Sequence, residues 1–356
     1  MNDTIKILGL SLLCVTFPGC ASVGPRTVAH DRFDYVNTIS DSWKDQMLLN
    51  MVMLRYGDAP VFLDVSSIIN SYSVETTVDG GLSWSFPPDS ESQNLGASAT
   101  YADRPTITYS PLSGARFARS LMAPIPTTAI LNLINAGYPV DLILRLCVSS
   151  INGIQNRYGG AARAHAADPE FYLLIERMRK IQQLGFVGFR IQKTDAGDVV
   201  LMILGETQRE EVQKDSDEIR RILRLNPDSR EFNVVYSSVP RNDKEVALLT
   251  RSMLEILIDM AANVTVPDTH VAEGRVNATF SETTADGVPI MPLIRFHNSA
   301  EKPSDAFVSV PYRGHWFWID DKDIRSKTIF SFLMFAFALT ETGGETAAPV
   351  VTIPIR

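Results

Sequence analysis

The stretch AFVSVPYRGHWFWIDDKDIRSKTIFSFLMFAFALT, residues 306–340, carries the strongest structural signal in the chain and decides the fold class that we predict. Its first part alternates apolar and polar residues around Arg313-Gly314, which predicts a β-hairpin of strands 306–312 and 315–319. Its second part predicts a helix over residues 324–340. Strands and helices that follow one another in separate blocks are typical of the α+β class.

The helix expected over residues 324–340 is apolar nearly all round, because only Ser331 is polar between residues 329 and 339. A helix of that kind is buried, so we expect it to be the hub of a C-terminal core. The acidic residues before it, Asp320, Asp321 and Asp323, could offer oxygens to Ca²⁺, but the Gly and distal Glu of a calcium loop are missing. They are better explained as caps that favour the positive end of the helix.

The strand predicted at residues 315–319 is rich in aromatic residues. Trp316 and Trp318 share one face and Phe317 and Ile319 share the other, so both faces are apolar. Strands of this kind are usually central in a sheet. We therefore favour core packing for this strand over a stacking platform for sugars or a belt that faces lipid.

The rest of the C-terminal lobe, which we place at residues 166–356, alternates helices and strands. Their order indicates a mixed sheet with helices packed on one face. The apolar patterns predict a helix at 169–184, a hairpin of strands 187–194 and 198–204, a helix at 207–225, a strand at 232–238, a helix at 243–262 and a final strand at 349–355.

An N-terminal α+β lobe is expected at residues 31–165, and the small, uncommitted stretch 159–168 supplies its boundary. This lobe should contain an N-terminal helix, a small antiparallel meander and a helical block. The expected elements are a helix at 34–56, a strand at 61–78 that turns at Asp79-Gly80-Gly81 into residues 82–86, a loop at 87–94, strands at 97–101 and 106–109, and helices at 114–122, 127–136 and 140–156.

Some features of this lobe bear on partners. The apolar stripe of the helix at 34–56 favours a core face over a partner-binding groove. The alternation in the meander invites comparison with outer-membrane strands, but these strands are too few to close a membrane-spanning sheet, so we do not expect one. The exposed loop expected at 87–94 is a first candidate for contact with a partner.

The composition limits the classes of partner. The 356 residues are 45% hydrophobic and 21% charged, enough for one large or two ordinary domains. The formal net charge of -8 argues against a broad attraction to nucleic acid, so no nucleic-acid partner is expected. Cys147 lies in an apolar run and is expected to be a buried, unreactive thiol.

The sequence holds no G-x-S-x-G, no H-E-x-x-H, no phosphate-binding glycine loop and no paired C-x-x-C. The five histidines, His30, His165, His270, His297 and His315, are far apart in sequence, although folding can still bring some of them together. We therefore predict no catalytic residue, no metal and no cofactor.

An export signal precedes both lobes. A short start with Lys6 is followed by the apolar run ILGLSLLCVTFPGC, residues 7–20. The run is too short to span a bilayer, which takes roughly 20 residues. Its end, Phe17-Pro18-Gly19-Cys20, resembles the lipobox of bacterial lipoproteins, in which the cysteine is acylated and becomes the mature N-terminus.

The resemblance implies a signal peptide at residues 1–19, a lipidated Cys20 and a flexible tether at residues 20–30. In this class an Asp after the cysteine retains the protein at the inner membrane. Ala21 follows here, which implies a lipid anchor in the outer membrane, with the protein facing the periplasm or the cell exterior.

These expectations favour a lipid-anchored cell-envelope protein with a structural, assembly or partner-binding role. Its partners would be the membrane, through the anchor, and an envelope protein. A lipid raises the effective concentration of the domain near other envelope components, which a scaffold exploits more directly than an enzyme acting on a diffusing substrate. The alternative is a periplasm-facing, hydrolase-like enzyme whose site assembles only in three dimensions.

Overall fold

The computed structural model describes residues 24–69, 72–83, 92–103, 106–112, 114–160, 164–194, 197–205, 207–279, 281–283 and 287–340. Its helices lie beside antiparallel and mixed sheets, so the described chain belongs to the α+β class, as the sequence predicts. Its described residues divide into two compact units, those within 24–43 and 63–111 and those within 44–62 and 112–340. Among the described helices, none is both long enough and apolar enough to span a membrane.

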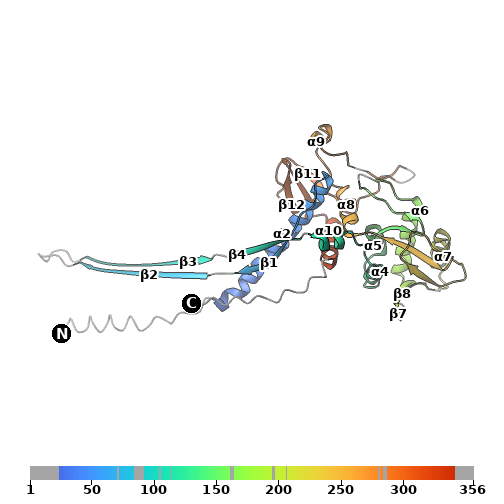
Figure 1. Ribbon diagram of the computed structural model, residues 1–356, viewed down its shortest axis with the longest axis horizontal. Helices are drawn as coiled ribbons and strands as arrows, with labels where there is room; N and C mark the ends of the chain where they lie inside the picture. Colours follow the sequence, from blue (N-terminus) through green and yellow to red (C-terminus); the bar gives the residue numbers. More distant parts are fainter. Residues whose placement is uncertain are drawn as a thin grey trace. The chain divides into compact units, whose positions relative to one another are not determined.

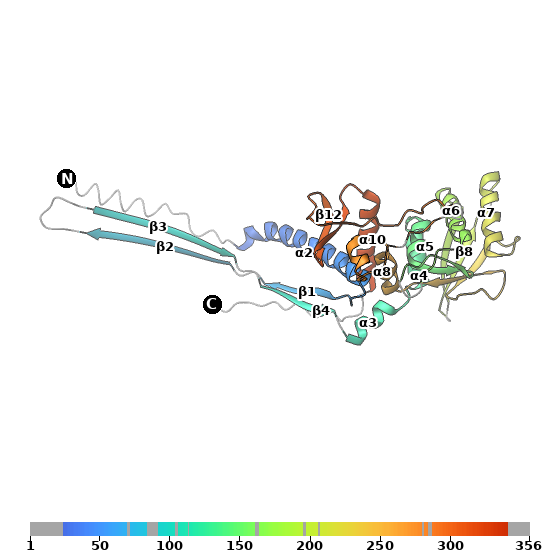
Figure 2. The same ribbon diagram turned by 90° about the horizontal axis from the view of Figure 1, so that it is seen from above.

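The first unit holds a nested β-hairpin and the first part of a long helix. The inner strands β2 and β3 pair with each other over twelve consecutive residue pairs, and the outer strands β1 and β4 form a second two-stranded sheet (Figures 1 and 2). The elements are α2 (Gly24–Arg55), β1 (Phe62–Ile69), β2 (Tyr72–Ser83), β3 (Ser92–Asp103) and β4 (Thr106–Leu112).

The turn predicted at Asp79-Gly80-Gly81 is wrong, because β2 continues through these residues. Gly80 pairs with Leu95 and Gly81 pairs with Asn94, inside the ladder with β3. Glycine permits a tight turn but also fits extended backbone, and here the partner strand supplies the hydrogen bonds. Of the loop predicted at 87–94, residues 92–94 belong to β3, and the rest lies outside the described residues.

The helix predicted near the N-terminus is confirmed as α2, which begins at Gly24, inside the stretch predicted as a flexible tether. Its apolar stripe divides into two parts. Met47 and Met51 are buried, but Phe33, Val36 and Trp43 are 71%, 55% and 41% exposed. The expected core face is therefore correct only for the C-terminal part of the helix.

The second unit is built on a six-stranded sheet in the order β6-β5-β10-β9-β8-β7, in which β9 and β10 run parallel and the other neighbours antiparallel. The helices α6 and α7 pack against each other beside this sheet (Figure 1). The elements up to α9 are α3 (Gly114–Met122), α4 (Thr127–Asn135), α5 (Val140–Cys147), β5 (Val148–Ile151), β6 (Ile154–Gln155), α6 (Pro169–Gln183), β7 (Val187–Thr194), β8 (Gly197–Leu204), α7 (Glu210–Leu223), β9 (Glu231–Val235), β10 (Glu245–Thr250), α8 (Met253–Ala261) and α9 (Asp268–Ala272).

The helix predicted at residues 140–156 is too long. It ends at Cys147, because the next four residues leave the helix and pair with β10 as strand β5. Asn152 and Gly153 then turn the chain with φ angles of 48° and 83°. Both are residue types that tolerate the left-handed conformation, so this turn returns the chain as β6.

The helix predicted at residues 243–262 is also too long, since its first part forms β10. This central strand is buried along most of its length, and an unbroken apolar run cannot be told from a helix by periodicity alone. The helix proper, α8, begins after Ser252. The Ser252 hydroxyl accepts a hydrogen bond from the Glu255 amide at 3.2 Å, and the Glu255 carboxylate accepts one from the Ser252 amide at 2.8 Å.

The predicted division between lobes at residues 165 and 166 falls within the second unit. Strands β5 and β6 on one side of it share a sheet with β7 to β10 on the other. Tyr158 and His165 also exchange two backbone hydrogen bonds, of 3.0 and 2.9 Å. Residues around this position are thus tied into the fold of the second unit.

The C-terminal hairpin is confirmed as β12 (Ala306–Tyr312) and β13 (His315–Asp320). Arg313 and Gly314 have φ angles of 47° and 84°, as a two-residue turn with two left-handed positions requires. β13 also pairs with β11 (His297–Ser299) and is the central strand of this three-stranded sheet, as predicted. Its apolar inner face is buried through Phe317 and Ile319.

The last described helix, α10 (Ile324–Thr340), packs one side into the core of the second unit. Its buried apolar residues are Ile329, Phe330, Phe332, Leu333 and Phe337. The expectation of burial nearly all round is wrong at Phe335, which is 51% exposed. The Phe337 ring stacks on Phe62 with the ring centres 4.6 Å apart, which joins the helix to the start of β1. The strand predicted at residues 349–355 lies outside the described residues.

Of the three acidic residues predicted to cap α10, Asp323 does so, whereas Asp320 accepts a hydrogen bond from the Lys322 amide and Asp321 pairs with Lys327. The Asp323 carboxylate accepts hydrogen bonds from the Ser326 amide at 3.1 Å and the Ser326 hydroxyl at 2.7 Å, and from Arg295 at 2.8 Å. Burial alone would raise the pKa of Asp323, but the bonds from Arg295 and Ser326 outweigh it and lower the pKa to about 2.

We expect Phe330→Ala to lower the free energy of unfolding by about 3–5 kcal/mol, since it leaves a cavity where a fully buried ring was. Phe335→Ala on the same helix is the matched control, and because its ring is half exposed it should cost no more than about 1 kcal/mol. Urea denaturation of both variants measures the difference. Equal losses would show that α10 is not the core helix.

Candidate functional site

Four buried charged residues of the second unit, Arg157, Arg251, Asp259 and Glu282, form a network that we call the buried ion network. Arg251 follows β10 and is 1% exposed, and its guanidinium donates to the Asp259 carboxylate on α8 at 3.0 Å. It also donates to the backbone carbonyl of Arg157. The Arg157 guanidinium lies 3.7 Å from Asp259 and 4.0 Å from Glu282.

Further hydrogen bonds hold the carboxylates of this network in place. Asp259 accepts from the Gly159 amide at 2.7 Å, and Glu282 accepts from the Ala167 amide at 2.9 Å and from the Tyr172 hydroxyl at 2.7 Å. Burial, and then the bond to Glu282, raise the pKa of Tyr172, so the phenol keeps its proton at neutral pH. Each of the four charged side chains has at least one partner in the network, although Nε of Arg251 has no hydrogen-bond partner among the described residues. The network is therefore arranged mainly as a structural core.

An open hollow of about 410 Å³ lies next to this network. Gly159 and Gly160 form part of its wall, and a Cβ on Gly159 would come within 2.4 Å of the Ala262 methyl group, so only glycine fits there. Arg55 lines the hollow but donates to the carbonyls of Val264 and Asn277, at 3.2 and 2.6 Å. The hollow is large enough for a small molecule, but its one charged side chain is already bonded to protein.

A second cluster joins residues that are far apart in sequence. The Tyr56 hydroxyl lies 2.7 Å from Nδ1 of His270, and the His270 ring meets the His315 ring edge to face with centres 5.0 Å apart. Burial, and then the neighbouring His315, lower the pKa of His270, while burial raises the pKa of Tyr56. Both groups are thus neutral near pH 7. We call Tyr56, His270 and His315 the Tyr56–His270 cluster.

Charged residues flank this cluster. Asp58 accepts hydrogen bonds from the Tyr312 hydroxyl and from Arg313, the latter at 2.9 Å. The bond from Tyr312 is the main reason that the pKa of Asp58 is lowered. The Arg313 guanidinium also lies over the Tyr56 ring, 5.1 Å from its centre. These contacts tie the end of α2 to the turn between β12 and β13.

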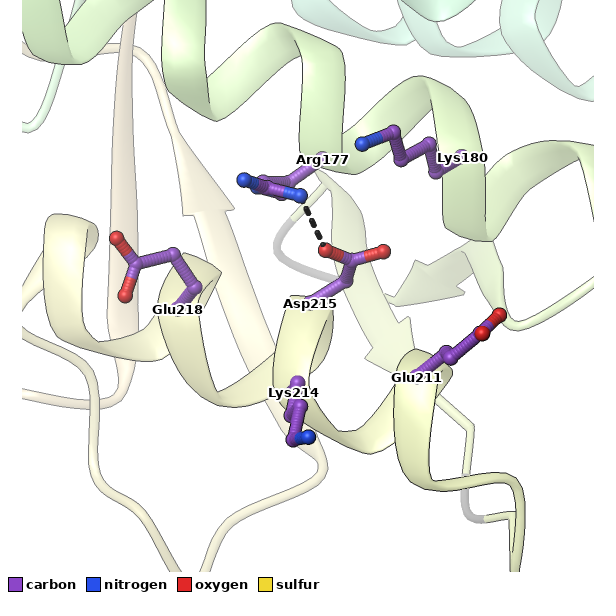
Figure 3. A pocket seen from close by; sticks show the side chains of 6 residues that line it. All are labelled: Arg177, Lys180, Glu211, Lys214, Asp215 and Glu218. Atoms are coloured by element: carbon purple, nitrogen blue, oxygen red, sulfur yellow. Dashed lines mark hydrogen bonds and ion pairs between the residues drawn. The ribbon is translucent and has the colours of Figure 1, made fainter.

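A third site is the charged groove between α6 and α7 (Figure 3). It is an open hollow of about 520 Å³, lined by Arg177, Lys180, Glu211, Lys214, Asp215 and Glu218. Arg177 on α6 donates to Asp215 on α7 at 2.9 Å, as Figure 3 shows. Lys180 pairs with Glu176, Lys214 with Glu210, and Glu218 with Arg221, all on their own helices. The charges balance, so the groove offers no net attraction to a charged ligand.

The structure accounts for several residues singled out in the sequence. Cys147 is buried, and burial raises the pKa of its thiol to about 12, so it is unreactive, as predicted. Trp318 stacks on His297 with ring centres 4.6 Å apart, and Lys302 lies over Trp316. Both indoles are thus in contact with neighbouring side chains. Cys20 lies outside the described residues.

Of the five histidines, folding unites His270 and His315. In the part of the chain that the structure describes, no three His, Cys, Asp or Glu side chains gather in a way that could hold a metal ion. Sequence reasoning missed the buried ion network. One signal was available. Asp259 stands in the apolar second half of α8, after the capping residue Glu255 and eight residues after Arg251, and an acid at such a position indicates a buried partner.

Asp259→Asn should lower the free energy of unfolding by about 3–5 kcal/mol, because it leaves two buried guanidinium groups without their shared carboxylate. Asp215→Asn removes a more exposed ion-pair partner and should cost no more than about 1 kcal/mol. Chemical denaturation of the two variants gives both values. A loss below about 1 kcal/mol for Asp259→Asn would contradict a structural role.

The lowered pKa of His270 predicts that acid destabilises the second unit. A histidine in the unfolded chain has a pKa of about 6.5, whereas the pKa of folded His270 is lower. At a pH between these two pKa values the unfolded chain binds more protons than the folded chain. The free energy of unfolding therefore decreases as the pH falls through this range. We expect His270→Asn to weaken this dependence in urea titrations between pH 7.5 and about 5. An unchanged slope in His270→Asn would refute the assignment.

Comparison with known proteins assigns no activity to these three sites. No family model matches the chain, and neither the curated proteins nor the solved structures contain a match. The sites are therefore judged on geometry. In the buried ion network and the charged groove, the charged side chains form hydrogen bonds and ion pairs with other residues of the same chain.

Proposed function

We propose that the protein is a lipid-anchored cell-envelope protein with an assembly or partner-binding role. The observation that carries the proposal is the exposed apolar stripe on the N-terminal part of α2, formed by Phe33, Val36 and Trp43. At 3.6 residues per turn these three positions fall on one side of the helix. The stripe is an interaction surface.

The stripe lies close in sequence to the proposed anchor. Cys20 precedes Gly24, the first residue of α2, by four positions. Acyl chains on Cys20 would hold the start of α2 at a membrane surface, and more than one chain is needed for stable attachment. A surface fixed in this way meets other envelope components at a high effective concentration. The partner of the stripe is accordingly proposed to be an envelope protein, with the outer membrane as the location.

The Tyr56–His270 cluster supports a second candidate, a periplasm-facing, hydrolase-like enzyme. A hydroxyl bonded to an imidazole at 2.7 Å resembles a nucleophile with its base. His315 is partly buried, and among the described residues its Nδ1 atom, which is buried, has no hydrogen-bond partner; its ring lies beside the His270 ring. Against this candidate, Tyr56 is buried and its pKa is raised, which makes the phenol a poor nucleophile. Hydrolysis of model esters that is lost in His270→Asn would favour it.

The anchor is tested by intact-mass measurement of the protein purified from membranes. We expect a mature chain that begins at Cys20 and carries acyl mass, and a Cys20→Ala variant that is no longer recovered with membranes. A chain that begins at another residue, or that lacks lipid mass, would contradict the anchor and the location that depends on it.

The stripe is tested by a photoreactive amino acid placed at Trp43 in intact cells. We expect a defined adduct with an envelope protein, because the indole there is exposed on the proposed partner surface. The matched control is Val239, a residue of the second unit that is 61% exposed and lies outside the stripe. Phe33→Ser should reduce the yield at position 43 by roughly tenfold, the effect of losing an apolar anchor. Equal adducts at both positions, or none, would overturn the proposal.

A further inference from the structure

The β2–β3 hairpin of the first unit has two faces of opposite character. Its twelve pairs run without a bulge from Tyr72 opposite Asp103 to Ser83 opposite Ser92. Residues of directly opposed pairs share a face, and the face alternates at each step along the strands. The register therefore assigns every residue of the hairpin to one face or the other.

One face is apolar and the other polar. The first carries Tyr72, Val74, Thr76, Val78, Gly80 and Leu82 from β2, with Gln93, Leu95, Ala97, Ala99, Tyr101 and Asp103 from β3. The second carries Ser73, Glu75, Thr77, Asp79, Gly81 and Ser83, with Ser92, Asn94, Gly96, Ser98, Thr100 and Ala102. The one charge on the first face, Asp103, stands at its end, whereas the second face has no apolar residue larger than alanine.

The length of the hairpin matches a bilayer. Strands in globular proteins have about 5–6 residues, whereas a tilted strand needs about 9–11 to cross the hydrocarbon core. The strands β2 and β3 have 12 residues each. Strands that alternate an apolar face toward lipid with a polar face toward water are the signature of membrane-spanning sheets.

We propose that the β2–β3 hairpin spans the membrane together with hairpins from other copies of this chain. In hydrocarbon every backbone amide and carbonyl must be bonded, so a lone pair of strands cannot cross. Among the described strands, β2 and β3 pair only with each other, which leaves each with a free edge that a neighbouring copy can pair with. From the sequence we do not expect membrane strands, because there are too few of them. Several copies of the chain together would supply enough strands.

The occupant of the apolar face is lipid, and the polar face borders water. The inference rests on the proposed function, because that proposal places the protein at a membrane. It adds that the anchored protein would also open a water-filled path across this membrane. A ring of such hairpins would carry Glu75 and Asp79 on its water-facing side. That charge favours the passage of cations over anions.

The test uses the mature, lipidated full chain, in which Cys147 is buried, so that a cysteine introduced into the hairpin can be labelled selectively. An environment-sensitive dye is placed in turn at Val74, Glu75, Thr76, Thr77 and Val78, and its emission is recorded with vesicles of phosphatidylethanolamine and phosphatidylglycerol. We expect blue-shifted emission at the positions of the apolar face and little shift at 75 and 77. A shift without this alternation, or none, would overturn the proposal.

A second readout is the release of a small dye from the same vesicles. Val78→Lys, on the apolar face at mid-strand, should reduce release at least tenfold, whereas Thr77→Lys on the polar face is the matched control and should retain it. Equal release by the two variants would refute the face assignment. Flotation with vesicles distinguishes failure of the anchor from failure of the hairpin inference. A chain that does not float and lacks acyl mass refutes the proposed function. A chain that floats but releases no dye refutes the hairpin inference.

Discussion

The ion pair between Arg251 and Asp259 is the interaction on which the second unit depends. Both side chains are buried, and a buried charge without a partner is strongly destabilising, so each fixes the other. Arg251 follows the central strand β10, Asp259 lies in α8, and the amide of Gly159 completes the coordination of the carboxylate. The absence of a Cβ on Gly159 lets the chain approach α8 at this point. Sheet, helix and the connecting segment are thereby held in one arrangement.

The polar sites of the second unit and the apolar surfaces of the first unit differ in what they offer to a ligand or partner. In the buried ion network and the charged groove, polar side chains are bonded within the chain, which leaves them to stabilise the fold. The surfaces of the first unit are different. The stripe around Trp43 is apolar and exposed, and one face of the β2–β3 hairpin is apolar by register. Apolar surface of this kind is costly in water, and both proposals, contact of the stripe with a partner and contact of the hairpin with lipid, rest on it.

Local signals in the sequence were sufficient for much of this fold. The hairpin around Arg313-Gly314, the cap at Asp323 and the helices α6, α7 and α10 follow from turn chemistry and periodicity within short windows. The β10 strand was mistaken for helix because an apolar run carries no periodicity of its own. Gly80 was mistaken for a turn because its partner, Leu95, could not be known in advance.

The contacts within the candidate sites were beyond the reach of local patterns. Tyr56 and His270 are 214 positions apart, and Gly159 and Asp259 are 100 apart. Only Asp259, an acid in the apolar second half of α8, signalled that a buried partner was needed. Long-range pairs of this kind are set by the packing of whole elements, which no window of sequence contains.

The central claim is that the second unit keeps its fold both in water and at the membrane, whereas the β2–β3 hairpin is proposed to find its remaining backbone partners in the membrane. Amide hydrogen exchange measures this directly, with the Cys20→Ala chain in buffer compared with the lipidated chain on vesicles. We predict slow exchange across residues 245–261 in both conditions, and exchange across residues 72–83 and 92–103 that slows markedly on vesicles alone. Equal exchange of the hairpin in both conditions, with the second unit protected throughout, would contradict the account.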